Sequence, residues 1–182
     1  MLQLHIPETE YYDEELNEFK TIKAQTLRLE HSLISISKWE SKYCKPFIDK
    51  KEKTVEETLY YIECMTLNSG IDPKVYLAIT NEMIDEVNKY IEAPMTATTI
   101  TDRNASSNRN QEILTSELLY YYMIEGGVPV EFEKWHLNRL IMLLRILGIK
   151  RDPKAKKMKK GQIMRQNASL NAARRKAMHS KG

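Results

Sequence analysis

The sequence predicts a mainly α fold: a compact multi-helix domain with a small two-stranded β element at its N-terminus and a basic helix or tail at its C-terminus. Three observations favour this class. Only 6 of the 182 residues are Gly and 6 are Pro, which is few for a fold built on tight β-turns. Residues that favour helices, such as Leu, Glu, Lys and Met, are abundant. Apolar residues also recur at intervals of three and four along most of the chain, as the buried face of a helix requires.

The first thirty residues predict a strand, a helix and a second strand. Apolar and polar residues alternate over 2–6, before Pro7, and again over 27–31, so these two stretches can pair as strands. Residues at helical spacing lie between them, which predicts a helix over 11–23. They are Tyr11, Tyr12, Glu15, Leu16, Phe19, Ile22 and Lys23.

Four further helices are predicted before residue 95. The first begins at Ser32 and ends before Pro46, with Trp39 as an anchor in the core. The second begins at Thr54, which forms a capping box with Glu57. A short third helix follows Asp72-Pro73, where a capping residue precedes a proline, and a fourth covers about 81–91.

The second half of the body predicts a long connection and two helices. Residues 95–111 are rich in Thr, Asn, Ser and Arg and have no periodicity, which indicates a flexible loop. A tyrosine-rich helix is expected over 113–124. The next, over about 131–147, is apolar nearly all round, so we expect neighbours to enclose it and Gly148 to end it.

Charge divides the chain into an acidic body, 1–149, and a basic extension, 150–182. The extension has twelve Lys or Arg and one acid, a net charge of +11, whereas the body has a net charge of −8. The spacing there predicts a helix over about 162–178 with a narrow apolar stripe, which needs a partner to be stable. Three roles stay open for the extension: binding nucleic acid, docking on an acidic protein, or keeping the chain soluble. The first is disfavoured because 150–182 contain no aromatic residue that could stack on a base.

The sequence carries no motif for catalysis, a cofactor or a metal. Its four histidines are scattered, and the glycine-rich loops that hold phosphates are missing. Cys44 and Cys64 are expected to be buried, inert thiols in a reducing cytoplasm, and adjacent acids such as Glu56 and Glu57 to be solvated. The longest apolar run, 140–144, is far too short to span a membrane.

One polar cluster has two interpretations. Trp135, Asn138 and Arg139 are spaced to share a helical face, where they could bind a planar or anionic group. The simpler interpretation, which we favour, is that Trp135 packs while Asn138 and Arg139 satisfy buried carbonyls or carboxylates of adjacent elements.

Several strings of residues together resemble the tail assembly chaperones of long-tailed bacteriophages. They run in order through nearly the whole chain, and the most specific is 133–140, which reads EKWHLNRL. The others are 29–33 (LEHSL), 37–42 (SKWESK), 61–66 (YIECMT), 115–121 (TSELLYY) and 169–176 (SLNAARRK).

The resemblance implies a non-enzymatic protein that binds the phage tape-measure protein, keeps it soluble and aids assembly of the tail tube. It also implies action in the host bacterial cytoplasm, absence from the mature virion and, in some members, a longer frameshifted product. The tail-tube protein is a further expected partner, and self-association is left open.

Contacts with the client are expected from apolar and methionine-containing helical faces. The basic extension would engage acidic stretches of the client or of the chaperone. The alternative function is a small nucleic-acid-binding protein that acts through its basic tail. The candidate contact residues are Tyr120, Tyr121, Met123, Trp135, Asn138, Arg139, Ile163, Leu170, Arg174, Arg175 and Lys176.

Overall fold

The structure is a computed structural model that describes residues 1–13, 17–49, 51–100 and 113–151, together with positions 164 and 168. By its internal contacts the chain divides into two units, Met1–Leu144 and Arg145–Gly182, and each is described by itself. The predicted loop from residue 101 onward and the predicted C-terminal helix lie outside the described residues, apart from Met164 and Ala168, which are helical.

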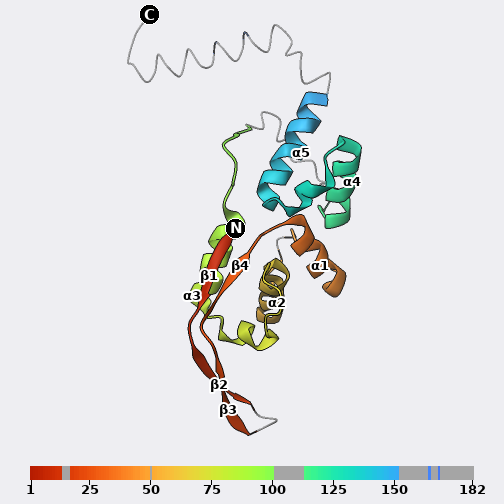
Figure 1. The fold of residues 1–182 in the computed structure, drawn as a ribbon. Coiled ribbons are helices and arrows are strands. Elements are labelled where there is room, and N and C mark those ends of the chain that lie inside the picture. The colour runs from red at the N-terminus through yellow and green to blue at the C-terminus, as the bar shows by residue number, and fades with distance from the viewer. Residues whose placement is uncertain (14–16, 50, 101–112, 152–163, 165–167, 169–182) are drawn as a thin grey trace, which may run out of the picture. The chain divides into compact units, whose positions relative to one another are not determined.

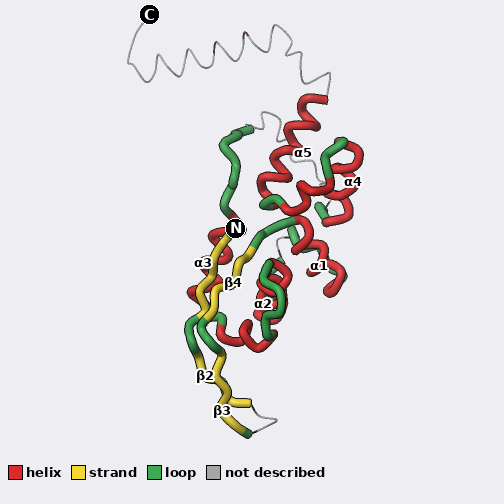
Figure 2. Tube along the Cα trace, viewed as in Figure 1, coloured by secondary structure: helices red, strands yellow, loops and turns green. Residues whose placement is uncertain are grey.

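The N-terminal strands form one long hairpin drawn as two small sheets (Figure 2). Strand β1 (Leu2–Ile6) pairs antiparallel with β4 (Gln25–Leu29), and β2 (Thr9–Asp13) pairs antiparallel with β3 (Glu18–Ile22). The register is the same in both sheets, since the residue numbers of each pair have the same total. The ladder is interrupted at Pro7, which has no N–H to donate to a neighbouring strand.

The predicted helix over 11–23 is wrong, because this segment forms β2 and β3. Tyr12 and Phe19 pair across the two strands with ring centroids 5.2 Å apart, on the exposed face of the hairpin. Asn17 has a φ of 53°, which asparagine tolerates in a turn but which would interrupt a helix. The chain is therefore mixed α/β rather than purely α, with two small two-stranded sheets beside its helices, and the predicted pairing of 2–6 with residues near 27 is confirmed.

The helices of the body begin where the capping residues predict. Ser32 accepts a hydrogen bond from the Ser35 amide, Thr54 forms its capping box with Glu57, and Asp72 accepts from the Lys74 amide. Figure 1 shows the elements, which are α1 (Leu33–Tyr43), α2 (Val55–Met65), the 3-10 helix η1 (Pro73–Ala78), α3 (Asn81–Glu92), α4 (Ser116–Gly126), the 3-10 helix η2 (Val130–Lys134) and α5 (Leu137–Arg151).

The helix predicted over 131–147 is two elements, η2 and α5. The break lies at Trp135-His136 because the backbone that follows Trp135 pairs with residues 31 and 32: His136 forms a β-bridge with Ser32, and the Leu137 amide donates to the His31 carbonyl at 2.7 Å. Helix α5 continues through Gly148 to Arg151, so the predicted end at Gly148 is also wrong. Only Leu137 and Leu140 of α5 are buried, whereas the sequence predicted enclosure on all sides.

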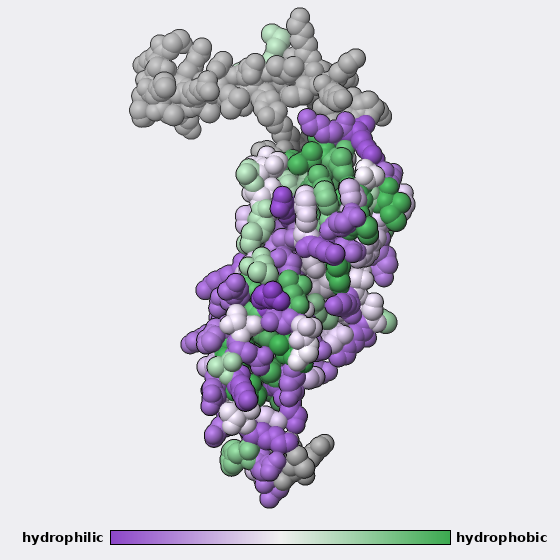
Figure 3. Space-filling view, in the orientation of Figure 1, coloured by the Kyte–Doolittle hydropathy of each residue, from purple (hydrophilic) through white to green (hydrophobic). Residues whose placement is uncertain are grey.

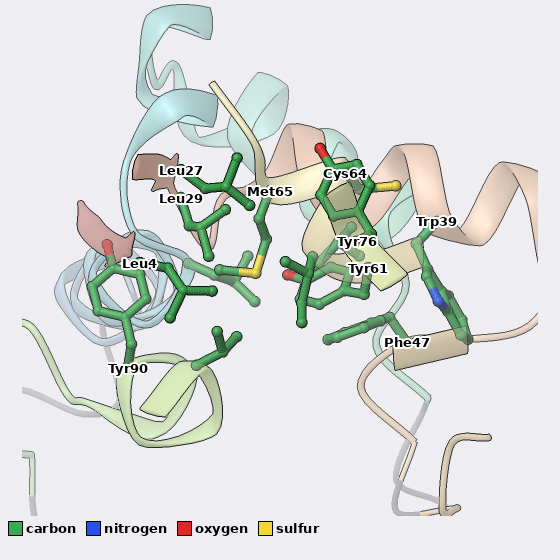
Figure 4. Packing of buried hydrophobic residues seen from close by; sticks show 14 of the residues in the cluster. Leu4, Leu27, Leu29, Trp39, Phe47, Tyr61, Cys64, Met65, Tyr76 and Tyr90 are labelled. Atoms are coloured by element: carbon green, nitrogen blue, oxygen red, sulfur yellow. The ribbon is translucent and has the colours of Figure 1, made fainter. Parts of the chain in front are cut away.

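The core is formed by side chains from the buried face of the β1–β4 sheet and from helices α1, α2 and α3. In Figure 4 the strand leucines lie to one side of Met65, and the rings of Tyr61, Phe47 and Trp39 lie to the other. Trp39 is 2% exposed, as predicted, and its indole N–H donates to the Glu57 carbonyl at 2.9 Å.

Two expectations about polar residues are corrected. Glu57 is buried rather than solvated, because its carboxylate accepts from Lys45 Nζ at 2.7 Å and from the Thr54 amide at 2.9 Å. The hydrogen bond from Lys45 also lowers the pKa of Glu57. Cys44 is exposed at the left-handed C-cap of α1, while Cys64 is buried as expected.

None of the described helices is long and apolar enough to cross a membrane.

Candidate protein-interaction surface

Helix α4 is fixed to the core along one side. Thr115 caps its start, and the buried carboxylate of Glu40 on α1 accepts from the Ser116 amide at 2.7 Å. The side chains of Ser116, Leu119 and Met123 face the core at intervals of three and four residues. Gly127 ends the helix with a φ of 63°, a left-handed conformation that favours glycine.

The opposite side of α4 and the start of η2 expose large apolar side chains. Ile124 is 80% exposed, Val130 60% and Tyr121 56%, and Tyr122 is also exposed. We call these four residues the α4 surface. Green, apolar residues gather over α4 in Figure 3. Exposed apolar residues grouped on one element are typical of a site that another molecule covers.

A hydrogen bond from Tyr120 links α4 to η2. Its hydroxyl donates to Glu133 Oε2 at 2.8 Å. Burial and this bond to a carboxylate raise the pKa of Tyr120 to about 12, so the phenol stays protonated at neutral pH and keeps donating. Tyr120 therefore helps to hold the α4 surface in position and, being partly buried, contributes little exposed area to it.

Beside the α4 surface, three side chains stack on one another. The rings of Phe132 and Trp135 lie nearly parallel, with centroids 3.9 Å apart, and the Arg139 guanidinium carbon lies 4.0 Å from the centroid of Trp135. Asn138 turns away from them and donates to the carbonyls of Ile91 and Ala93 at 2.8 and 2.9 Å. The simpler interpretation of this cluster therefore holds for Trp135 and Asn138, whereas Arg139 lies on an aromatic ring instead of on a buried carbonyl or carboxylate.

A buried pair of histidines anchors the start of α5 to the sheet and α1. The rings of His31 and His136 are 5.1 Å apart. His31 Nδ1 lies 2.5 Å from the Tyr61 hydroxyl, and His136 Nε2 donates to the Tyr90 carbonyl at 3.0 Å. Burial, with a smaller contribution from His136, lowers the pKa of His31 to about 3, and burial also lowers the pKa of His136. Both rings are therefore neutral at pH 7.

The predicted contact residues differ in how exposed they are in the structure. Tyr121 is exposed on the α4 surface, Tyr120 and Trp135 are partly buried beside it, and Met123 is 2% exposed in the core, where it offers no surface to a client. Ile163, Leu170, Arg174, Arg175 and Lys176 lie outside the described residues.

Sequence reasoning missed Ile124, Val130 and Tyr122. The signal that could have found them is the composition of α4, which is apolar on both sides although only one side reaches the core.

The described residues hold no group of three or more His, Cys, Asp or Glu side chains that could bind a metal ion. One pocket in this part of the chain, of about 210 Å³, lies beside Trp39 and is lined by Lys45, Lys53 and Glu57 among others. Another, of about 460 Å³, lies between β3 and η1 and includes Tyr11, Lys20 and Lys74.

No protein-family model, curated protein or solved structure gives a significant match to the chain. Three of the strings that carry the resemblance to tail assembly chaperones lie together in the described part of the chain. His31 from 29–33, Tyr61 from 61–66 and His136 from 133–140 form the buried cluster described above. These three motif residues therefore have a structural role, because they hold α5 and η2 against the core.

Proposed function

We propose that this chain is a non-enzymatic tail assembly chaperone that binds the phage tape-measure protein, keeps it soluble and aids assembly of the tail tube in the bacterial host. The motif resemblance supports the family, and the exposed apolar residues of the α4 surface carry the argument for binding. A client that is long and helical would aggregate through its apolar faces, and covering such a face with the α4 surface would prevent this.

The construction of α4 suits this role. The core-facing residues, the Glu40 bond at its start and the Tyr120 bond to Glu133 fix the helix. Its outer side chains can therefore remain apolar without collapsing into the core. A rigid helix that presents large side chains loses little conformational entropy on binding.

The test is the soluble fraction of the tape-measure protein expressed with and without this chain. We expect the wild-type chain to raise that fraction and to co-purify with the client at low and high salt, because apolar contacts resist salt. The double variant Tyr121→Ser/Ile124→Ser should lose about tenfold in affinity, since exposed aromatic and aliphatic anchors dominate such interfaces.

Leu77→Ser provides the matched control, because Leu77 is an equally exposed apolar residue on η1, away from α4. This variant should behave like the wild type. A wild-type chain that leaves the client insoluble, and that instead co-purifies with nucleic acid released as salt rises, would overturn the proposal in favour of nucleic-acid binding through the basic extension.

A further inference from the structure

Arg139 carries an exposed positive charge in the first turn of α5, which the proposed function does not use. Its guanidinium carbon lies 4.0 Å from the centroid of the Trp135 ring. Among the described residues, no carboxylate or carbonyl forms an ion pair or a hydrogen bond with this guanidinium. Its charge is therefore in contact with an aromatic ring, while its N–H groups can still donate to a ligand.

The two faces of the Trp135 ring are both covered. The ring of Phe132 is nearly parallel to it, with centroids 3.9 Å apart. Two groups that each lie about 4 Å from the ring centre would overlap on one face, so Phe132 and Arg139 lie on opposite faces. A planar ligand such as a nucleic-acid base therefore has no face of Trp135 on which to stack. Of the planar and anionic ligands that the sequence allows for this cluster, the anionic one fits.

The backbone that carries Arg139 is fixed to the body. The Leu137 amide donates to the His31 carbonyl at 2.7 Å, and the Asn138 side chain donates to two carbonyls at the C-terminal end of α3. An arginine held on an aromatic ring and on a fixed backbone loses less conformational entropy when it binds. Its planar group matches a carboxylate, which can accept two parallel hydrogen bonds from it.

The charges near Arg139 favour a single carboxylate over a polyanion. In residues 130–140 the Lys and Arg residues are Lys134 and Arg139, and the acids are Glu131 and Glu133. These charges balance, so the stretch has no net positive charge to attract a phosphate backbone. One carboxylate on an otherwise apolar segment needs only one guanidinium.

We propose that Arg139 binds the carboxylate of an Asp or Glu on the apolar helical segment of the client that covers the α4 surface. This inference rests on the proposed function and names the polar contact at its interface. Val130 of the α4 surface and Phe132 of the aromatic stack belong to the same short helix, η2, so the two contact regions are adjacent. The α4 surface would supply apolar contact, and Arg139 would fix the position of the segment.

The test measures the fluorescence anisotropy of labelled synthetic peptides of about 20 residues, with one apolar helical face, bound to the full chain. A small series places one Glu at different positions flanking that face, and each peptide has a twin with Gln instead. The wild-type chain should bind the best Glu peptide about tenfold more tightly than its twin. Arg139→Gln should bind both alike, with the affinity that the wild type has for the Gln peptide, which also shows that the variant is folded.

Two further variants separate the guanidinium from net charge. Arg139→Lys keeps the positive charge but not the planar group, and it should lose most of the preference for Glu. Lys134→Gln is the matched control, because it removes an exposed cation next to Trp135 in the chain. This variant should keep most of the preference.

Several results would overturn the inference. An equal preference in the wild type and Arg139→Gln would show that Arg139 only covers the Trp135 ring, and equal losses in Arg139→Gln and Lys134→Gln would indicate net charge alone. Binding of no peptide would also contradict it. Binding of a single-stranded oligonucleotide in place of the peptides, if it depended on Arg139, would assign this residue to nucleic acid.

Failure of the inference is distinguishable from failure of the proposed function. A wild-type chain that solubilises the tape-measure protein but shows no preference for Glu retains the function and loses only this inference. A chain that shows the preference but leaves the client insoluble loses the function.

Discussion

At the scale of single residues, several buried polar groups of the described chain have hydrogen-bond partners that are distant in the sequence. Tyr90 donates to Glu30 at 2.7 Å, and burial together with that bond raises the pKa of Tyr90. Glu40 accepts from the amides of Phe47 and Ser116, each at 2.7 Å. His31 is the residue with the largest consequence, because its lowered pKa couples folding to protons.

Stability should fall as the pH drops from 7 to 5. An unfolded His31 takes up a proton near pH 6.5, whereas the folded one, with its pKa lowered to about 3, stays neutral. The unfolded state therefore binds more protons below pH 6.5, and His31 alone should cost about 2 kcal/mol of unfolding free energy between pH 7 and pH 5. Urea unfolding at the two pH values measures this loss.

The variant His31→Asn provides the comparison, because the amide can replace Nδ1 as a partner of Tyr61 but does not titrate. It should lose about 2 kcal/mol less than the wild type over the same pH interval. Equal losses in the two proteins would show that His31 is not the source.

At the scale of elements, capping residues predicted helix starts reliably, whereas periodicity predicted α3 correctly and failed over 11–23. Ser32, Thr54 and Asp72 each begin a helix, because a capping hydrogen bond is formed within a few residues. The spacing over 11–23 also fits a helix, but Tyr11, Tyr12, Phe19 and Ile22 favour strands. The pairing of β2 with β3, in the same register as the β1–β4 ladder, decides the outcome, and such pairing has no signature in a short window of sequence.

Two glycines should respond oppositely to alanine. Gly148 lies inside α5 with open space around the position of a Cβ, so Gly148→Ala should stabilise that helix locally by about 0.5–1 kcal/mol. Gly127 has a φ of 63°, so Gly127→Ala should lower the unfolding free energy by about 1 kcal/mol.

Hydrogen exchange of the amides near residue 148 measures the first effect, and urea unfolding measures the second. Faster exchange in Gly148→Ala would contradict the continuous helix and would favour the break that the sequence predicted.

At the scale of the whole molecule, the core and the charge are distributed differently. Every buried apolar residue of the described chain lies between Leu4 and Leu140. The basic residues are concentrated beyond 149, where the net charge is +11 against −8 for the rest. The buried apolar residues that stabilise the body therefore lie in one part of the chain, while the net positive charge lies in another.

A chain that ends at residue 153 should unfold at the same urea midpoint as the full chain, because the deletion removes none of the described core. Co-expression of this shortened chain with the tape-measure protein tests whether the basic extension contributes to client binding. A lower soluble fraction of the tape-measure protein, at an unchanged urea midpoint of the shortened chain, would show that it does. A lower midpoint would contradict the expectation and show that the extension stabilises the body.

By itself the sequence determined the starts of α1, α2 and η1, the N-terminal strand pairing, the core position of Trp39 and the division of charge, because each depends on neighbouring residues or on composition. The tertiary structure decided what depends on distant partners. It turned 11–23 into a hairpin, divided η2 from α5 through the contacts of His31 with Leu137 and His136, and buried Glu57 against Lys45. It also decided which side of α4 faces the core, which placed Met123 inside and left Tyr121 and Ile124 exposed, since burial depends on where the rest of the chain packs.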